Sequence, residues 1–315
     1  MIVTMFINYE TFIKASPVFY GVVFVLLVAV LFTAPINGAS RWFTFGTITF
    51  QPTELAKVAV ILMLAFVIPK IQKYSKKDIN KPTRLLLVLA VVAVPVGLIV
   101  LQPDIGTAMV FCVLLAMVLF TSGIYKRYII AVIVIVVVSA PLIYQFALPP
   151  HAKQRIDIFL NPESDPRGAG YNIIQSKLAV GSGGLTGMGL FRGNQTQLGF
   201  LHPKTTDFIF AVISEEMGFI VSGAVVILFV YFTNKALYVA KTAKNDTGAI
   251  VAAGIAGIFL FHTMQNIGMV MGLLPISGVP LPFISYGGSS MITSFICIGL
   301  LLNISGKRQK TIFVK

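Results

Sequence analysis

The amino-acid sequence predicts an all-α fold: a polytopic helical membrane protein with about eight transmembrane helices and one long extracytoplasmic loop. Of the 315 residues, 57% are hydrophobic and only 11% are charged, and the mean hydropathy is +0.89. Water-soluble domains are about 45–50% apolar and about 25% charged, so this composition excludes an ordinary soluble domain. A spanning barrel would show short alternating segments, whereas this chain has long continuous apolar runs.

Eight apolar runs come close to the roughly 20 residues with which a helix crosses a bilayer. In chain order they cover residues 17–34, 54–70, 84–101, 105–122, 128–147, 207–232, 248–272 and 283–303. The mixed segment before the first run lacks the cleavage site of a secretory signal, so we expect no segment to be removed. Most of the 24 lysines and arginines fall in short loops on one side, which places both termini in the cytoplasm. The net charge of +13 is then mostly explained by the lysines and arginines of the cytoplasmic loops, and we expect no nucleic-acid partner.

The segment 148–206, between the fifth and sixth runs, is the long outer loop and is rich in Gly and Pro. A structureless loop of this length in a compact protein is usually functional. Its glycines would let backbone amides approach an anionic group closely, although a tightly folded re-entrant loop would have the same composition. It matches neither a Walker nor a Rossmann fingerprint, because no GKS or GKT sequence and no βαβ unit accompany the glycines.

Ionisable residues at the edges of the runs are candidate functional residues, because the bilayer core penalises each by about 2.5 to 3.5 kcal/mol. Glu54 and Lys57 stand three residues apart, which places them on one helix face as an ion pair; a structural pair that pins the helix end is the alternative. Asp207 lies where the long loop enters the sixth run, and an N-cap is its alternative. Glu215 and Glu216 follow about two turns deeper, and as neighbours at most one of them should face a cavity.

Other polar groups have structural interpretations. Asp104 lies in a tight outer turn and is expected to cap the fourth helix. His262, Gln265 and Asn266 share one face of the seventh helix, where we expect interhelical hydrogen bonds rather than metal ligation. The prolines within residues 275–282 predict a bent start of the last helix.

Acids and bases at the outer face, beside a glycine-rich loop, favour chemistry on an anionic substrate delivered at the membrane surface. Because the sequence contains no ATP-binding motif, the energy would have to be stored in the substrate, as in a lipid pyrophosphate that carries a sugar. One carboxylate would act as base, and cations would stabilise the leaving pyrophosphate.

Five blocks of sequence, in this order, resemble the SEDS family (shape, elongation, division and sporulation) over nearly the whole chain. They are GASRWFTFGTITFQPTELAK (38–57), QPDIGTA (102–108), RIDIFLNPESDPRGAGYNIIQSKLAVGSGGLTGMG (155–189), TDFIFAVISEEMGF (206–219) and GLLPISGVPLPFISYGGSS (272–290). A further stretch, GNQTQLGFL (193–201), is similar to the elongation branch of the family rather than to its division branch.

The resemblance implies a peptidoglycan glycosyltransferase that polymerises lipid II at the outer face of the bacterial cell membrane, for cell-wall elongation and cell shape. It implies that Asp207 is the general base, taking a proton from the 4-hydroxyl of the acceptor sugar while undecaprenyl pyrophosphate leaves and a β-1,4 link forms. Glu54 and Lys57 match a family pair near the same cavity, with a role in site organisation or phosphate contact. Arg155 and Lys177 are further candidates for binding the pyrophosphate.

Partners also follow from the resemblance: lipid II, the membrane and a class B penicillin-binding protein. A divalent cation, Mg²⁺ or Mn²⁺, could assist the pyrophosphate, but no cofactor is certain and no metal ligands are predicted. Cys112 and Cys297 lie inside apolar runs and indicate neither a zinc site nor a disulfide.

Residues 1–315 are predicted to form one SEDS-type membrane domain, with two departures from the family pattern. The family normally has ten spans, and this chain begins where the third would begin, so either its start lies upstream or the form is shortened. Residues 202–205, just before Thr206, differ from the family's usual residues, which weakens any role for that stretch.

Two other functions stay open from the residues alone. A transporter that flips lipid II or another lipid-linked precursor would also need a helical bundle with buried charges, but it should carry polar residues on inner helices. Glu54, Lys57 and Asp207 all lie at outer ends, which favours polymerisation. A non-catalytic scaffold of a cell-wall synthesis complex would tolerate replacement of Asp207.

Overall fold

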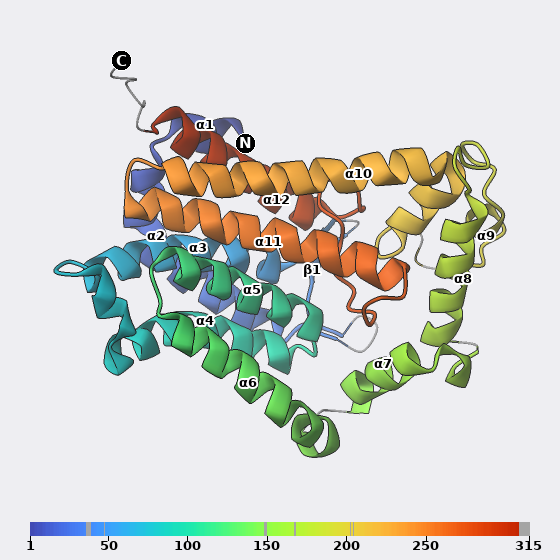
Figure 1. Cartoon of the computed structure of the whole chain (residues 1–315), viewed down its shortest axis with the longest axis horizontal. Coiled ribbons are helices and arrows are strands. Elements are labelled where there is room, and N and C mark those ends of the chain that lie inside the picture. Colours follow the sequence, from blue (N-terminus) through green and yellow to red (C-terminus); the bar gives the residue numbers. More distant parts are fainter. Residues whose placement is uncertain are drawn as a thin grey trace. The chain divides into compact units, whose positions relative to one another are not determined.

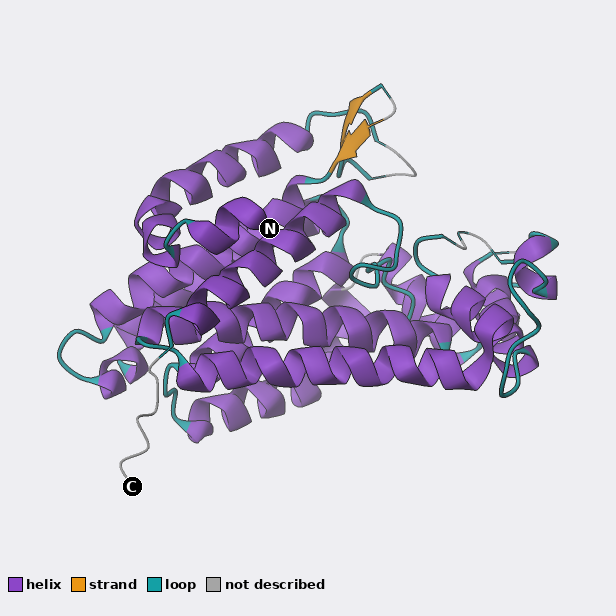
Figure 2. Ribbon diagram, turned by 90° about the horizontal axis from the view of Figure 1, so that it is seen from above, coloured by secondary structure: helices purple, strands orange, loops and turns teal. Residues whose placement is uncertain are grey.

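The computed structural model is almost entirely helical (Figures 1 and 2) and describes residues 1–35, 39–46, 48–147, 150–166, 168–201, 203 and 205–308. Within these residues the strands are β1 (Phe43–Phe45) and β2 (Ile48–Phe50), an antiparallel hairpin in which Thr44 pairs with Thr49. The chain divides into two compact units. Unit 1 comprises Met1–Ile124, Tyr231–Leu260 and Gly288–Lys315, and unit 2 comprises Tyr125–Val230 and Phe261–Gly287.

Unit 1 is built around a helix that is buried over most of its length. Its helices are α1 (Ile2–Phe6), α2 (Tyr9–Val30), α3 (Pro52–Ile71), η1 (Lys76–Asn80), α4 (Pro82–Leu101), α5 (Ile105–Thr121) and α12 (Gly288–Gly306), with parts of α10 (Ile209–Thr242) and α11 (Asp246–Val270). The central helix α3 contacts α2, α4, α5 and α12. Proline at the first position starts both α3 and α4, because proline fixes a helical φ there and the amide that it lacks would have no partner.

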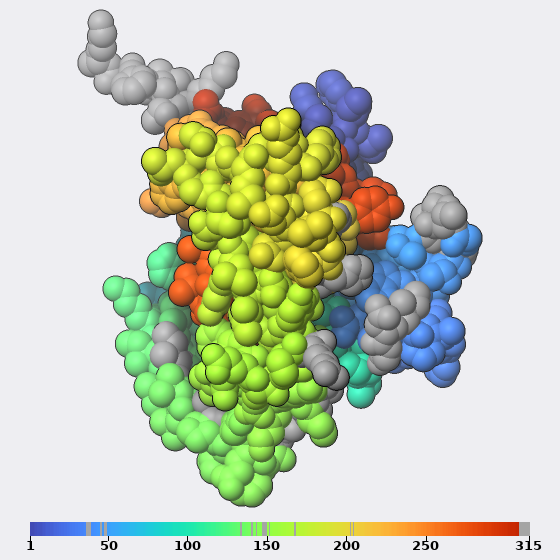
Figure 3. Space-filling view, turned by 90° about the vertical axis from the view of Figure 1, so that its right-hand side faces the viewer, coloured from blue at the N-terminus to red at the C-terminus, as the bar shows by residue number. Residues whose placement is uncertain are grey.

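Unit 2 contains the segment 148–206, which is largely helical rather than structureless. Its elements are α6 (Lys126–Leu142), the π-helix η2 (Ile143–Ala147), α7 (Pro150–Leu160), η3 (Pro162–Ser164), α8 (Ala169–Ser182), α9 (Asn194–Gln197), residues 209–230 of α10 and residues 261–270 of α11. Figure 3 faces the yellow-green segment from α7 to α9. Most of residues 150–182 is thus helical, and the buried positions of α8 recur every three residues, at Gly170, Ile173, Ser176 and Ala179.

The polytopic helical membrane fold is confirmed. Five helices are long and apolar enough to cross a membrane: α2, α4, α10, α11 and α12. A shorter apolar helix, α5, covers the run 105–122, and the remaining two runs lie on α3 and α6. By length and composition alone, the described residues therefore support fewer spans than the eight expected.

Two helix boundaries differ from the expected runs for identifiable reasons. Helix α2 begins at Tyr9 because Asn8 caps it, accepting a hydrogen bond from the Glu10 amide at 3.2 Å. Helix α10 continues to Thr242 and is interrupted at Gly218, whose φ of 73° is a conformation that favours glycine. The bent start of the last helix is confirmed, since α12 begins only at Gly288.

Candidate functional site

The backbone around Asp207 is held by side chains and amides from two other segments of unit 2. Asn266 of α11 donates to the Asp207 carbonyl at 3.0 Å, and Ser285 donates to the Thr206 carbonyl at 2.7 Å. The Tyr286 amide donates to the Thr205 carbonyl at 2.9 Å. Asp207 itself is partly exposed and precedes the first residue of α10 by two positions. These bonds fix the position of the Asp207 backbone just before the helix.

The polar face of α11 makes hydrogen bonds, and the bonds described here reach the proline-rich segment 272–287. His262 Nδ1 lies 2.9 Å from the Pro280 carbonyl, and Gln265 donates to the Pro275 carbonyl at 2.8 Å. Asn266 makes a second bond, to the Val279 carbonyl, at 2.9 Å. A proline-rich segment cannot satisfy its carbonyls in a regular helix or sheet, so polar side chains of the neighbouring helix satisfy them.

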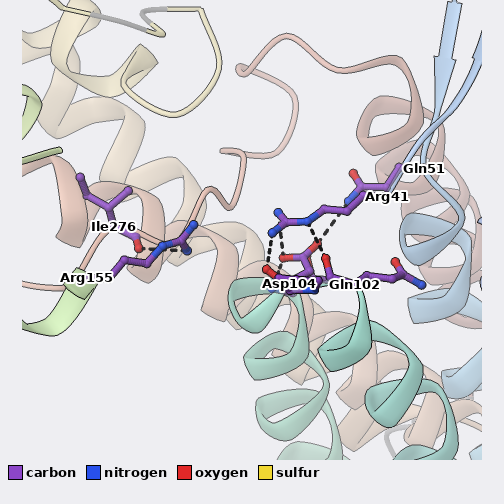
Figure 4. A network of polar contacts seen from close by, with 8 residues as sticks. Arg41, Gln51, Gln102, Asp104, Arg155 and Ile276 are labelled. Atoms are coloured by element: carbon purple, nitrogen blue, oxygen red, sulfur yellow. Dashed lines mark hydrogen bonds and ion pairs between the residues drawn. The ribbon is translucent and has the colours of Figure 1, made fainter. Parts of the chain in front are cut away.

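This same segment, 272–287, brings three predicted site residues into one region. Arg155, on α7, donates to the Ile276 carbonyl at 3.5 Å (Figure 4). The Asp207 carboxylate faces Gly278, where a Cβ would lie 3.7 Å from Asp207 Oδ2. The Lys177 side chain, on α8, packs against Gly272. A Cβ at position 272 would collide with the Lys177 side chain. Residues far apart in sequence therefore gather along one short stretch, with the exposed Lys177 at one end.

The adjacent acids Glu215 and Glu216 are both buried, and both bind the segment 191–197 (loop 191–197), which ends in the short helix α9. Glu215 accepts from the amides of Gln195 and Thr196 at 2.7 and 3.1 Å. Glu216 accepts from the Phe191 amide at 3.0 Å and from the Gln197 side chain at 2.9 Å. The sequence had suggested only that at most one of them faces a cavity.

The glycine-rich segment 183–193 makes this arrangement possible. A Cβ at Gly193 would lie 2.5 Å from Glu215 Oε2, and a Cβ at Gly187 would collide with the Glu216 carbonyl. The Phe219 amide, next to the break in α10, donates to the Gly184 carbonyl at 2.9 Å. The Met188 and Gly189 amides donate to the backbone carbonyls of Glu215 and Glu216 at 2.9 and 3.0 Å, and the Phe191 amide donates to the Glu216 carboxylate. The alternative of a tightly folded loop is therefore the one that the geometry supports.

In unit 1, Glu54 and Lys57 form the predicted ion pair on α3. Lys57 Nζ lies 2.8 Å from Glu54 Oε1, and the two side chains are only 1% and 5% exposed, in that order. Burial of both charges requires such a pair, because an isolated charge in a low-dielectric interior carries a large desolvation cost.

A second polar network of unit 1 was not predicted as a unit. Arg41 Nη1 lies 3.6 Å from Asp104 Oδ1, and Arg41 Nε donates to the Gln102 carbonyl at 3.1 Å (Figure 4). Asp104 also caps α5, accepting from the Thr107 amide at 3.2 Å, which confirms the predicted cap. Gln51, the residue before α3, donates to Asp104 Oδ2 at 3.4 Å. The signal that could have linked them is a lone arginine, Arg41, between the first two apolar runs and a lone acid, Asp104, between the third and fourth.

Comparisons with known proteins agree over nearly the whole chain. Residues 1–310 match the FtsW, RodA and SpoVE family, described as "cell cycle protein". Peptidoglycan glycosyltransferase MrdB of Escherichia coli K12 is 39% identical over 297 residues, covering 93% of this chain and 78% of MrdB. Peptidoglycan glycosyltransferase RodA of Treponema pallidum is 31% identical, covering 94% of this chain and 83% of that protein.

Solved structures show the same fold. A chain from a peptidoglycan synthase complex that coordinates polymerization and crosslinking has a TM-score of 0.81 at 26% identity, over 98% of this chain and 86% of that chain. The rod shape determining protein RodA of Thermus thermophilus has a TM-score of 0.69 at 26% identity, over 98% of this chain and 83% of that chain.

Proposed function

The chain belongs to the FtsW, RodA and SpoVE family, and on that premise we propose that it is a peptidoglycan glycosyltransferase that polymerises lipid II into β-1,4-linked glycan strands. Relatives named peptidoglycan glycosyltransferases support the activity. The observation in the structure that carries the proposal is the gathering of Asp207, Arg155 and Lys177 along segment 272–287.

In this mechanism Asp207 is the general base. It takes the proton from the 4-hydroxyl of the acceptor N-acetylglucosamine, whose oxygen attacks the anomeric carbon of the donor N-acetylmuramic acid. The bond from that carbon to the pyrophosphate breaks, undecaprenyl pyrophosphate leaves, and inversion gives the β-1,4 link. A backbone fixed by Asn266, Ser285 and Tyr286 suits this role, because general-base catalysis requires a carboxylate held within hydrogen-bond reach of the hydroxyl.

Cations would stabilise the charge that develops on the leaving pyrophosphate. Arg155 and Lys177 are assigned this role, because charged hydrogen bonds to phosphate are stronger than neutral ones. Glu54 and Lys57 are assigned to site organisation or phosphate contact. Among the described residues no group of three His, Cys, Asp or Glu side chains could hold a metal ion, so these residues would supply at most one or two such ligands to a Mg²⁺ or Mn²⁺ ion at the pyrophosphate.

We assign the active site to the outer face of the bacterial cell membrane and both termini to the cytoplasm, from the distribution of lysine and arginine. We also propose a class B penicillin-binding protein as partner and one membrane domain over residues 1–315. A structural neighbour from a peptidoglycan synthase complex supports the partner.

Polymerisation of labelled lipid II by the purified full chain, with and without a class B penicillin-binding protein, tests the proposal. We expect Asp207→Asn to lower the rate of strand formation by about 10²- to 10⁴-fold, the usual contribution of a general base. Asp246→Asn removes an exposed carboxylate that pairs with Lys76 and should leave the rate unchanged. Strands made at the native rate by Asp207→Asn would refute the base. If the native chain makes no strands but moves labelled lipid II across a vesicle membrane, it is a transporter.

A further inference from the structure

A groove of ≈ 300 Å³ lies between the C-terminal parts of α10 and α12, both within unit 1 and far along the chain from Asp207. Figure 1 shows these two helices in yellow-orange and red. The groove is lined by Phe232, Lys235, Ala236, Tyr238, Val239, Ile298, Leu301, Leu302, Ser305 and Arg308. None of these residues has a part in the proposed reaction.

The walls of the groove are apolar and open outwards. On α10, Phe232, Ala236 and Val239 recur at helical spacing and line one side, over a length of about 10 Å at 1.5 Å per residue. On α12, Leu301 and Leu302 line the other side, and Leu302 is 46% exposed. An apolar groove that opens from a membrane-spanning helix pair meets the acyl chains of the bilayer.

The groove lining also carries positive charge. Lys235 and Arg308 are both exposed, and its lining contains no carboxylate. Lys235 Nζ lies 5.2 Å from the centre of the Tyr231 ring and 6.0 Å from that of Tyr238. Tyrosine and lysine together are typical of the level of the lipid headgroups. Within the described part of the chain, neither Lys235 nor Arg308 forms an ion pair, so both charges are available to an anion.

We propose that this groove binds one anionic phospholipid, with its phosphate between Lys235 and Arg308 and an acyl chain along Phe232, Val239 and Leu302. Basic pockets between transmembrane helices are suited to anionic lipid headgroups. The site is independent of the glycosyltransferase proposal.

Native mass spectrometry of the delipidated full chain tests the site. The chain is titrated with phosphatidylglycerol, with phosphatidylcholine of the same acyl chains, and with glycerol 3-phosphate as a headgroup without chains. We expect phosphatidylglycerol to bind more tightly than the other two. Each cation near the headgroup contributes about fivefold, so Lys235→Ala with Arg308→Ala should weaken phosphatidylglycerol about 30-fold.

The matched control is Lys241→Ala with Lys244→Ala, which removes two exposed lysines outside the groove lining and changes the net charge equally. It should leave the affinity for phosphatidylglycerol unchanged. Val239→Phe fills the groove without changing the charge, so it should weaken the binding of phosphatidylglycerol. Thermal unfolding checks that each variant is folded. Equal losses in both lysine variants, equal binding of phosphatidylcholine, or unchanged binding by folded Val239→Phe would each overturn the proposal.

Discussion

Glu54 in unit 1 and Glu215 in unit 2 are both buried carboxylates on helices, at 4% and 0% exposure, but they are neutralised in different ways. Glu54 is paired with the ammonium of Lys57, one turn along the same helix. Glu215, with Glu216 beside it, is held by backbone amides of a loop about twenty residues earlier in the chain. Glu54 is thus stabilised by a partner on its own helix, whereas Glu215 and Glu216 order a separate segment of the chain.

The difference shows what each carboxylate does for the fold. An ion pair between two side chains of one helix orders little other structure, and a well-packed apolar pair could replace it at little cost in stability. Carboxylates that accept several amide hydrogen bonds fix a segment that has few apolar contacts of its own. The glycines of residues 183–193 admit this contact, and the two glutamates hold the loop in place.

Removing one partner of the ion pair should have the largest effect. Lys57→Met leaves Glu54 as an unpaired buried charge, and we expect the free energy of unfolding to fall by about 3 to 5 kcal/mol. Thermal and denaturant unfolding in detergent measures the loss. Glu54→Gln combined with Lys57→Met should recover most of it, and Lys76→Met, at an exposed pair, should change little. If the double variant is as unstable as Lys57→Met, the pair contributes more than mutual neutralisation.

The glutamates that bind the loop should show a smaller and asymmetric effect. Glu215→Gln places an amide donor against the Gln195 and Thr196 amides, so a buried donor loses its acceptor at a cost of about 1 to 3 kcal/mol. Glu216→Gln should cost less, because the Gln197 side-chain amide and the Thr196 hydroxyl, which face Glu216, can reorient to offer an acceptor. Hydrogen exchange of the amides in 191–197 reports the loosening, and equal protection in both variants would contradict the asymmetry.

Asp104 is stabilised in both ways. It accepts a hydrogen bond from the Thr107 backbone amide, and it forms an ion pair with Arg41. Asp104→Ala loses the helix cap and should lower stability by about 1 kcal/mol. Asp104→Asn keeps an acceptor for the Thr107 amide and should cost less. The comparison of the two melting temperatures separates the cap from the charge. If Asp104→Asn costs as much as Asp104→Ala, the pairing with Arg41 is the dominant part.

The smallest effect is expected at Asp78, in the loop between α3 and α4, where hydrogen bonds to Lys81 and then to Arg84 hold the pKa of the carboxyl below its usual 3.8. A lowered pKa in the folded state means that the ionised form stabilises the fold above pH 3.8 and that this contribution is lost as the pH falls through the folded-state value. Asp78→Asn should therefore be slightly less stable than the native chain at neutral pH, with the difference vanishing in strong acid. Unfolding at a series of pH values measures it, and a difference that is constant with pH would exclude the ion pairs as its source.

The helical membrane class could be predicted because it follows from composition and run length, which do not depend on tertiary contacts. The Glu54–Lys57 pair was also predictable, since three-residue spacing on a helix brings the side chains together wherever the helix lies. The helices between residues 150 and 182 were missed, because in a polar and glycine-rich stretch the apolar positions that drive them are few.

The sequence by itself determined which segments are apolar, which positions carry charge, and which residues cap helices, such as Asp104. Only the tertiary structure decided that Arg155, Lys177 and Asp207 gather along residues 272–287, and that Glu215 and Glu216 bind loop 191–197. The physical reason is that these contacts join groups far apart in the chain through backbone amides and carbonyls. Every residue carries such groups, so side-chain identity alone does not show which of them will meet.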